Sequence, residues 1–256
     1  MKYNSLLLQV LTQRIQQSLG AQLVGLYVHG SIAFGCFQWQ SSDIDLLIVT
    51  HSVPTEAQKR ALIQVFLELT PLAPPKGLEM SAVLVQDCVH FRYPTPFSLH
   101  FSPMHLAACK KDLTEYCRNM HGVDRDLAAH FTVVRQVGIP LYGPPPRQIF
   151  GPVPRICYLD SIFRDVADAS QEIIDNPVYF VLNLCRVLSY LQNGIVCSKE
   201  TGGLWALKHL PECWHPLLQQ CLTAYRTGSP PQLERRTLLL FCAVMQANIQ
   251  RHQSEL

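Results

Sequence analysis

Charged residues are scarce in this 256-residue chain: Lys, Arg, Asp and Glu together make up 16% of it, and the formal net charge is only +2. Proteins that bind nucleic acid through its phosphates usually have a large basic excess, which is missing here. We therefore expect no nucleic-acid partner. The longest apolar run, residues 238–245, is too short to cross a bilayer. The apolar segment LLLQVL near the N-terminus is interrupted by Gln9 and does not resemble a signal peptide. We expect no membrane association.

Metal-binding and disulfide patterns are also lacking. The ten cysteines are scattered, with no CxxC pair and no spacing typical of a zinc site. Together with the missing export signal, this is typical of reduced thiols in a cytoplasm, most of them acting as small buried hydrophobic groups. We expect a cytoplasmic protein and a monomer. Apolar residues make up 48% of the chain, enough for one large domain or two modest ones.

The first half of the chain alternates between two periodicities. Apolar residues recur at helical spacing in residues 5–19 and 55–69, whereas residues 23–28, 43–50 and 78–85 are short runs of apolar and β-branched residues typical of strands. This alternation predicts a mixed sheet covered by helices.

The second half differs in character. Residues 143–155 (GPPPRQIFGPVPR) are dense in proline and glycine, as at a domain boundary. The pattern beyond them is helical and predicts helices over residues 158–174, 178–192, 199–209, 214–225 and 232–250. A helical bundle is the natural interpretation. The sequence thus predicts an α+β protein with domains at residues 1–148 and 149–256.

One short stretch, VHGSIAFGCFQWQSSDIDLLIVT (residues 28–50), carries the chemistry. In a strand successive side chains point to opposite faces, so Asp43 and Asp45 share one face and Ile44 lies on the other. Two adjacent carboxylates repel each other unless divalent cations lie between them. Magnesium often takes one or two protein carboxylates and completes its shell with substrate phosphate oxygens.

The Gly30-Ser31 turn upstream supplies groups that suit a phosphate. Glycine lets the backbone approach closely, and the hydroxyl and nearby N–H groups can donate to phosphate oxygens, especially where a helix starts. A lone HGS is an ordinary turn, and a lone DxD is often a loop or a capping pair. The two together, separated by eleven residues, predict a site for a metal-bound triphosphate.

This combination resembles the signature of the polymerase-β-like nucleotidyltransferase superfamily. Further segments are similar to the aminoglycoside adenylyltransferases that modify streptomycin and spectinomycin: SDIDLL, LEMSAVLV, FRYP, DRDLAAHF, LYGPP, VLNLCRV and SKETGGLWALKHLP. The resemblance extends from about residue 21 to 230 and includes the helical half. It implies a polymerase-β-like nucleotidyltransferase domain followed by an all-α domain that completes the cleft for ATP and acceptor.

The resemblance also implies an activity, which is AMP transfer from ATP to a hydroxyl of a small acceptor, with two magnesium ions and release of pyrophosphate. Asp43, Asp45 and Glu79 match the family's metal ligands, and Glu79 matches its catalytic base. A carboxylate within an otherwise apolar strand is costly to bury unpaired, which independently favours a functional site. The alternative is a glutamate on an exposed edge strand.

Gly30 and Ser31 match the family's nucleotide-binding turn, and three residues of the helical half match positions that the family uses for ATP. These are Arg186, Lys199 and Tyr225. Each has a simpler interpretation: a brace between domains for Arg186, a solvated first helical turn for Lys199 and ordinary helix packing for Tyr225. Ser198 is expected to cap the helix that Lys199 opens.

On the acceptor side the sequence departs from the family pattern. Met104 stands where the drug-modifying enzymes have a tryptophan that packs against the aminoglycoside, and Asn176 stands where they have an aspartate. Glu172 and Asp175 are the nearby carboxylates that could replace this aspartate. The acceptor site is thus the part of the resemblance that transfers least directly.

Three functions follow from these observations. The first is adenylylation of an aminoglycoside-type small molecule of the spectinomycin or streptomycin class. The second keeps the fold and chemistry but modifies a hydroxyl of a protein or another metabolite. The third is a nucleotide-binding module without turnover, against which the presence of both aspartates and Glu79 argues.

Overall fold

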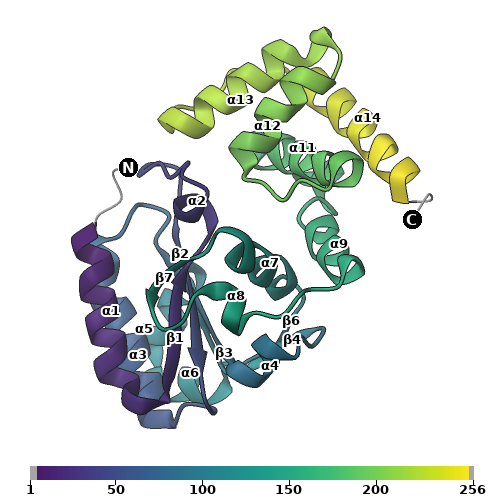
Figure 1. Cartoon of the computed structure of the whole chain (residues 1–256). Helices are drawn as coiled ribbons and strands as arrows, with labels where there is room; N and C mark the ends of the chain where they lie inside the picture. Colours follow the sequence, from purple (N-terminus) through teal and green to yellow (C-terminus); the bar gives the residue numbers. More distant parts are fainter. Residues whose placement is uncertain (1–4, 254–256) are drawn as a thin grey trace. The chain divides into compact units, whose positions relative to one another are not determined.

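A computed structural model describes residues 5–253 of the chain, shown in Figure 1. It divides into two compact units, Met1–Tyr158 and Leu159–Leu256. The first combines sheet and helices and the second is built from helices, as the α+β prediction requires. None of the helices within residues 5–253 has the length and apolar character needed to span a membrane.

The first unit is built on a five-stranded sheet with strand order β5-β3-β2-β1-β7. Its strands are β1 (Leu23–Val28), β2 (Ile44–Thr50), β3 (Leu78–Leu84), β5 (Leu99–Phe101) and β7 (Ile139–Tyr142). The pairing of β2 with β3 is parallel and the other pairings are antiparallel, so the sheet is mixed, as predicted. Two further strands, β4 (Thr95–Phe97) and β6 (Gly122–Asp124), form a separate antiparallel pair.

Helices cover both faces of this sheet (Figure 1). The helices of the first unit are α1 (Ser5–Leu19), α2 (Gly30–Ala33), α3 (Glu56–Leu69), α4 (Val85–Val89), α5 (Leu106–Lys111), α6 (Leu113–Asn119), α7 (Leu127–Val137) and α8 (Pro146–Ile149). Alternation along β2 divides the core: Leu46 and Ile48 face the cluster with α1 and α3, whereas Leu47 and Val49 face the cluster with α7 and α8. The apolar face of each helix thereby finds a partner.

The second unit is a helical bundle arranged around α11 (Pro177–Asn193), which contacts α12 (Lys199–His209), α13 (His215–Thr227) and α14 (Arg235–Gln253). Gly202 of α12 permits close packing, because a Cβ there would lie 2.9 Å from the Arg186 Cα of α11. Glycines in the left-handed region, Gly194 and Gly228, end α11 and α13.

One predicted helix is wrong. The structure replaces the expected helix over residues 158–174 by α9 (Arg155–Arg164), turns at residues 165–168, and the short α10 (Ala169–Glu172). Asp165 lies in this break and forms an ion pair with Arg186. The apolar spacing continues through the break, so periodicity alone does not reveal it.

The border between the units lies inside α9, about ten residues after the expected boundary at 148/149. The physical reason is aromatic packing. The Phe150 ring lies 5.0 Å from the Phe131 ring and 5.2 Å from the Tyr27 ring, so the proline-rich segment is anchored in the core of the first unit.

Candidate active site

Three carboxylates meet at one end of the parallel strand pair. Asp43 directly precedes β2, Asp45 is its second residue, and Glu79 is the second residue of β3. Asp45 and Glu79 are register partners. One carboxylate oxygen from each of the three residues lies within 4.8 Å of the others, and all three residues are partly exposed. We call Asp43, Asp45 and Glu79 the acidic trio.

Glu79 lies on an interior strand, since β3 is flanked by β2 and β5. The alternative of a glutamate on an exposed edge strand is therefore wrong. Burial raises the pKa of Glu79, and the neighbouring Asp43 carboxylate raises it further, while His130 acts in the opposite direction. A divalent cation among these oxygens would favour their ionised forms.

The Gly30-Ser31 turn packs directly against this group. Gly30 has a φ of +58°, and a Cβ there would lie 1.8 Å from Asp45 Oδ2, so only glycine fits. Ser31 Oγ is buried and has no hydrogen-bond partner among the described residues. An orphaned hydroxyl in the turn that packs against Asp45 suits a polar ligand with a cation, because buried polar groups normally find partners. Helix α2 begins at Gly30, immediately after β1 and His29.

Sequence reasoning missed a group of residues around the acidic trio. His29 follows β1 and is 5% exposed, and its ring centroid lies 4.7 Å from that of His130 on α7. His130 Nε2 lies 3.2 Å from Asp126 Oδ2. The signal was the spacing of Asp126 and His130, four residues apart at the start of a helix-patterned stretch.

A serine–histidine pair extends this polar region along β3. Ser81 lies two residues after Glu79 and therefore on the same face of the strand. Its Oγ lies 3.0 Å from His100 Nδ1 on β5. Burial, together with His105, lowers the pKa of His100 to about 4, so this imidazole is neutral at pH 7.

The cations predicted for ATP lie in the second unit and have partners there. Arg186 forms an ion pair with Asp165, in which both side chains are about one-fifth exposed. The Nζ of Lys199 lies 4.7 Å from the Tyr179 ring centroid, a cation–π contact. Ser198 caps α12 by accepting a hydrogen bond from the Thr201 N–H at 3.0 Å, so its predicted role is confirmed.

Tyr225 is partly buried on α13. The residue after it, Arg226, pairs with Glu200 at 2.5 Å and so connects α13 to the first turn of α12. The structure thus places Tyr225 beside an inter-helix contact within the bundle.

The acceptor candidates are surface residues. Glu172, Asp175 and Asn176 are exposed around the end of α10 and the start of α11, where Asn176 is the N-cap residue. Met104 is 82% exposed in the short 3-10 helix Pro103–His105 of the first unit. The described residues of the first unit leave its side chain open to contact with a ligand.

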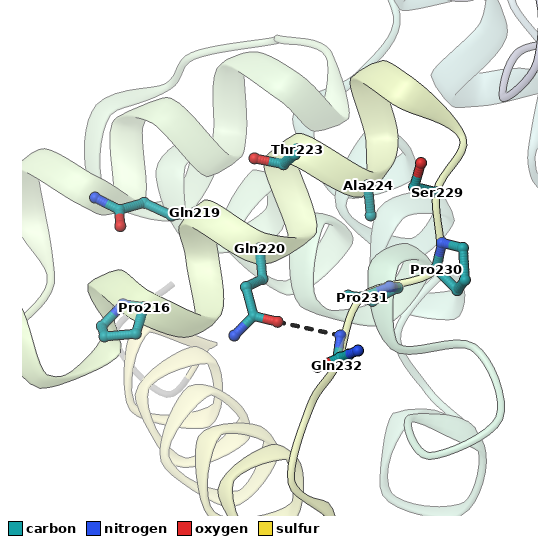
Figure 2. Close-up of a pocket in the computed structure, with 9 residues that line it drawn as sticks. All are labelled: Pro216, Gln219, Gln220, Thr223, Ala224, Ser229, Pro230, Pro231 and Gln232. Carbon is teal, nitrogen blue, oxygen red and sulfur yellow. Dashed lines mark hydrogen bonds between the residues drawn. The ribbon is translucent and has the colours of Figure 1, made fainter.

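A separate cavity of about 530 Å³ lies between α13 and residues 229–232 (Figure 2). The Gln232 N–H donates to Gln220 Oε1 at 3.1 Å across it. Among the nine described residues that line it none is charged, and none is a predicted site residue. Its lining does not suit a triphosphate.

Comparison with known proteins supports the resemblance. Residues 148–247 match the family model of the aminoglycoside adenylyltransferase C-terminal domain. An aminoglycoside (3'') (9) adenylyltransferase of Escherichia coli is 26% identical over 229 residues, which are 87% of this chain and 85% of the relative. A spectinomycin 9-adenylyltransferase of Staphylococcus aureus (strain Mu50 / ATCC 700699) is 24% identical over 220 residues, which are 83% of this chain and 81% of the relative.

The chain is similar to aminoglycoside adenylyltransferases over more than four-fifths of its length, and its helical half matches their C-terminal domain. Its fold is similar to that in the crystal structure of spectinomycin adenyltransferase AAD(9) from Enterococcus faecialis with ATP and spectinomycin, with a TM-score of 0.78 and 16% identity. The match covers 97% of this chain and all of that one. This match supports the predicted nucleotidyltransferase fold over both halves of the chain.

Proposed function

We propose that this protein is an ATP-dependent O-nucleotidyltransferase that transfers AMP to a hydroxyl of an aminoglycoside-type small molecule, of the spectinomycin or streptomycin class, and releases pyrophosphate. The observation that carries the proposal is the acidic trio, whose oxygens converge beside the Gly30-Ser31 turn in a chain similar to aminoglycoside adenylyltransferases. The relatives' names and the AAD(9) complex support both ATP and this acceptor class.

Asp43, Asp45 and Glu79 would hold two magnesium ions, which supply charge neutralisation for the triphosphate and acidify the attacking hydroxyl. Glu79 is the general base that accepts the proton of the acceptor hydroxyl. Its place opposite Asp45 in the parallel pairing of β2 and β3 supports this role. The Ser31 hydroxyl is the donor to a phosphate oxygen.

Arg186 and Lys199 bind the phosphates of ATP, and Tyr225 contacts the nucleotide. Arginine offers planar paired donors and lysine a compact charge. The partners of both cations favour this role over a free surface position, because the ion pair with Asp165 and the Tyr179 ring fix them before ligand arrives.

Met104 is the proposed acceptor contact of the first unit, and the exposed residues Glu172, Asp175 and Asn176 are the proposed acceptor contacts of the second. The two carboxylates among these suit a cationic drug. Met104 and Asn176, where the family has tryptophan and aspartate, favour a second candidate, the same chemistry on a hydroxyl of a protein or of another metabolite. We also infer a cytoplasmic monomer, a location supported by ten unbridged cysteines.

The experiment is AMP transfer from α-labelled ATP with magnesium, scored by labelled product and by pyrophosphate release over a panel that includes spectinomycin and streptomycin. We expect turnover of at least one drug by the wild type and none by Glu79→Ala. A labelled protein band in cell lysate without drug turnover would replace the first candidate by the second. The absence of both a modified drug and a labelled protein, together with nucleotide binding that does not depend on magnesium, would contradict both candidate functions.

A further inference from the structure

The acidic trio lies close to a histidine that the proposed reaction does not use. Three carboxylates within 4.8 Å of one another repel strongly when no cation is bound. His130 is connected to this group through His29, which contacts both the His130 ring and the Asp45 backbone. Helix α7, which carries His130, packs against the short helix α2 that begins at Gly30.

His130 is held from one side by Asp126. Its Nε2 lies 3.2 Å from Asp126 Oδ2, one helical turn earlier, and only one-fifth of the His130 side chain is exposed. Asp126 is itself held, because its backbone N–H donates to Asp124 Oδ1 at 2.8 Å. Burial opposes the charged imidazole, but the Asp126 carboxylate outweighs it and, with Glu79 and Asp45, raises the pKa of His130 to about 10.

On its other side His130 contacts the strand end that leads to the site. Its ring lies 4.7 Å from the His29 ring, centroid to centroid. The His29 backbone N–H donates to the Asp45 carbonyl oxygen at 3.1 Å. The two rings are tilted by 46° to each other. Burial and the neighbouring His130 lower the pKa of His29 well below its usual value.

We propose that His130 is a positioning residue for the acidic trio, whose mutual repulsion it offsets and whose Asp45 it holds in place through His29. An isolated helical ion pair between residues four apart contributes little. The ion pair between Asp126 and His130 differs, because His130 also contacts the buried His29, which leads to the acidic trio. Helix stability alone does not require a charged residue at this place. The kinetic part of this inference rests on the proposed function.

A thermodynamic cycle tests the coupling without ATP or acceptor. The unfolding temperature is measured in EDTA at pH 7 for wild type, His130→Gln, Glu79→Gln and the double variant. Glutamine keeps a donor for Asp126 but removes the charge. We expect His130→Gln to lower the unfolding temperature by about 3 °C or more in the wild type, and by less than half of that beside Glu79→Gln. An equal decrease in both backgrounds would overturn the proposal.

Two further variants make the cycle conclusive. Asp126→Asn removes the negative charge beside His130 and leaves the imidazole ring in place, and it replaces His130→Gln in the cycle if that variant fails to fold. His121→Leu is the matched control, because His121 is exposed and nine residues away in the sequence. We expect no coupling between it and Glu79→Gln.

The kinetic arm uses folded protein and saturating magnesium. We expect His130→Gln to lower kcat about tenfold while the KM of the acceptor changes less than twofold, because acceptor contacts are untouched. A purely structural role would leave kcat per folded molecule unchanged, which would contradict positioning. If no acceptor is turned over even by the wild type, the proposed function fails, whereas the cycle in EDTA still decides the electrostatic coupling.

Discussion

In the first unit three carboxylates converge at the edge of a buried sheet face, whereas in the second unit the charged side chains at predicted nucleotide positions are already paired. The carboxylate oxygens of the acidic trio lie close enough together to hold a cation. Arg186 has Asp165, and Lys199 has the Tyr179 ring. The sheet unit thus contains carboxylates that repel one another unless a cation binds. The helical unit contains cations whose positions are already fixed by partners within that unit.

The largest effect is expected from removing Glu79, the proposed general base. Glu79→Ala should lower AMP transfer about a thousandfold, because no other described carboxylate of the site pairs with Asp45 across the strands. The measurement is pyrophosphate release per folded enzyme. Glu68→Ala, an exposed carboxylate on α3, is the control and should retain full activity. Residual activity above a tenth of the wild type would show that Glu79 is not the base.

The turn beside the trio should be nearly as sensitive. Gly30→Ala places a methyl group 1.8 Å from Asp45 Oδ2 in a backbone conformation with φ of +58°. We expect a loss of about a hundredfold in kcat and a lower unfolding temperature, because Asp45 or the turn must move. Gly35→Ala has a comparable positive φ but open space around it, so it should be destabilised without the same kinetic loss. Equal kinetic losses in both variants would indicate strain alone.

The paired cations of the second unit give a smaller effect. Arg186→Ala should raise the KM for ATP about tenfold or more, because the proposed charge-assisted contact to phosphate would be lost. Asp165→Asn breaks the same ion pair but leaves the arginine, so both variants should lose stability and only the first should bind ATP poorly. The measurements are initial rates over ATP concentration and thermal unfolding. Similar KM values for ATP in the two variants would show that Arg186 stabilises the structure and does not bind ATP.

The smallest effect concerns stability and pH in the absence of metal. The folded protein holds the Glu79 proton more firmly than the unfolded chain, because its pKa is raised by burial and by Asp43. Ionised Glu79 therefore destabilises the folded protein. This loss of stability is absent below the pKa of Glu79 in the unfolded chain and complete above its raised pKa in the folded protein. In EDTA, Glu79→Gln should unfold about 3 °C higher than the wild type at pH 8, with a smaller difference as the pH falls. A difference that grows towards low pH would contradict the sign.

Local sequence predicted the three longest strands and the two longest helices of the first unit. Residues 43–50 and 78–85 were predicted as strands, and their observed parallel register aligns Asp45 with Glu79. Residues 86–142 carried no element prediction, although β5 and β7 complete the sheet there. These strands have three and four residues, too few for periodicity to reveal, and their pairing partners are distant in the sequence.

Side-chain partners were harder to predict than elements. The resemblance identified Arg186, but not Asp165, because the ion pair joins a helix to a break that the apolar spacing conceals. His29 and His130 are about a hundred residues apart and meet only because α7 packs against α2. Long-range contacts of this kind depend on the complete fold, and no local pattern encodes them.

The most direct test of the central claim is nucleotide binding with and without a divalent ion. Calorimetric titration of a non-hydrolysable ATP analogue should show binding with magnesium that weakens at least tenfold in EDTA, and an Asp45→Asn variant should bind weakly in both conditions. Equal affinity of the wild type with magnesium and with EDTA would contradict the claim that the acidic trio holds the metal-bound triphosphate.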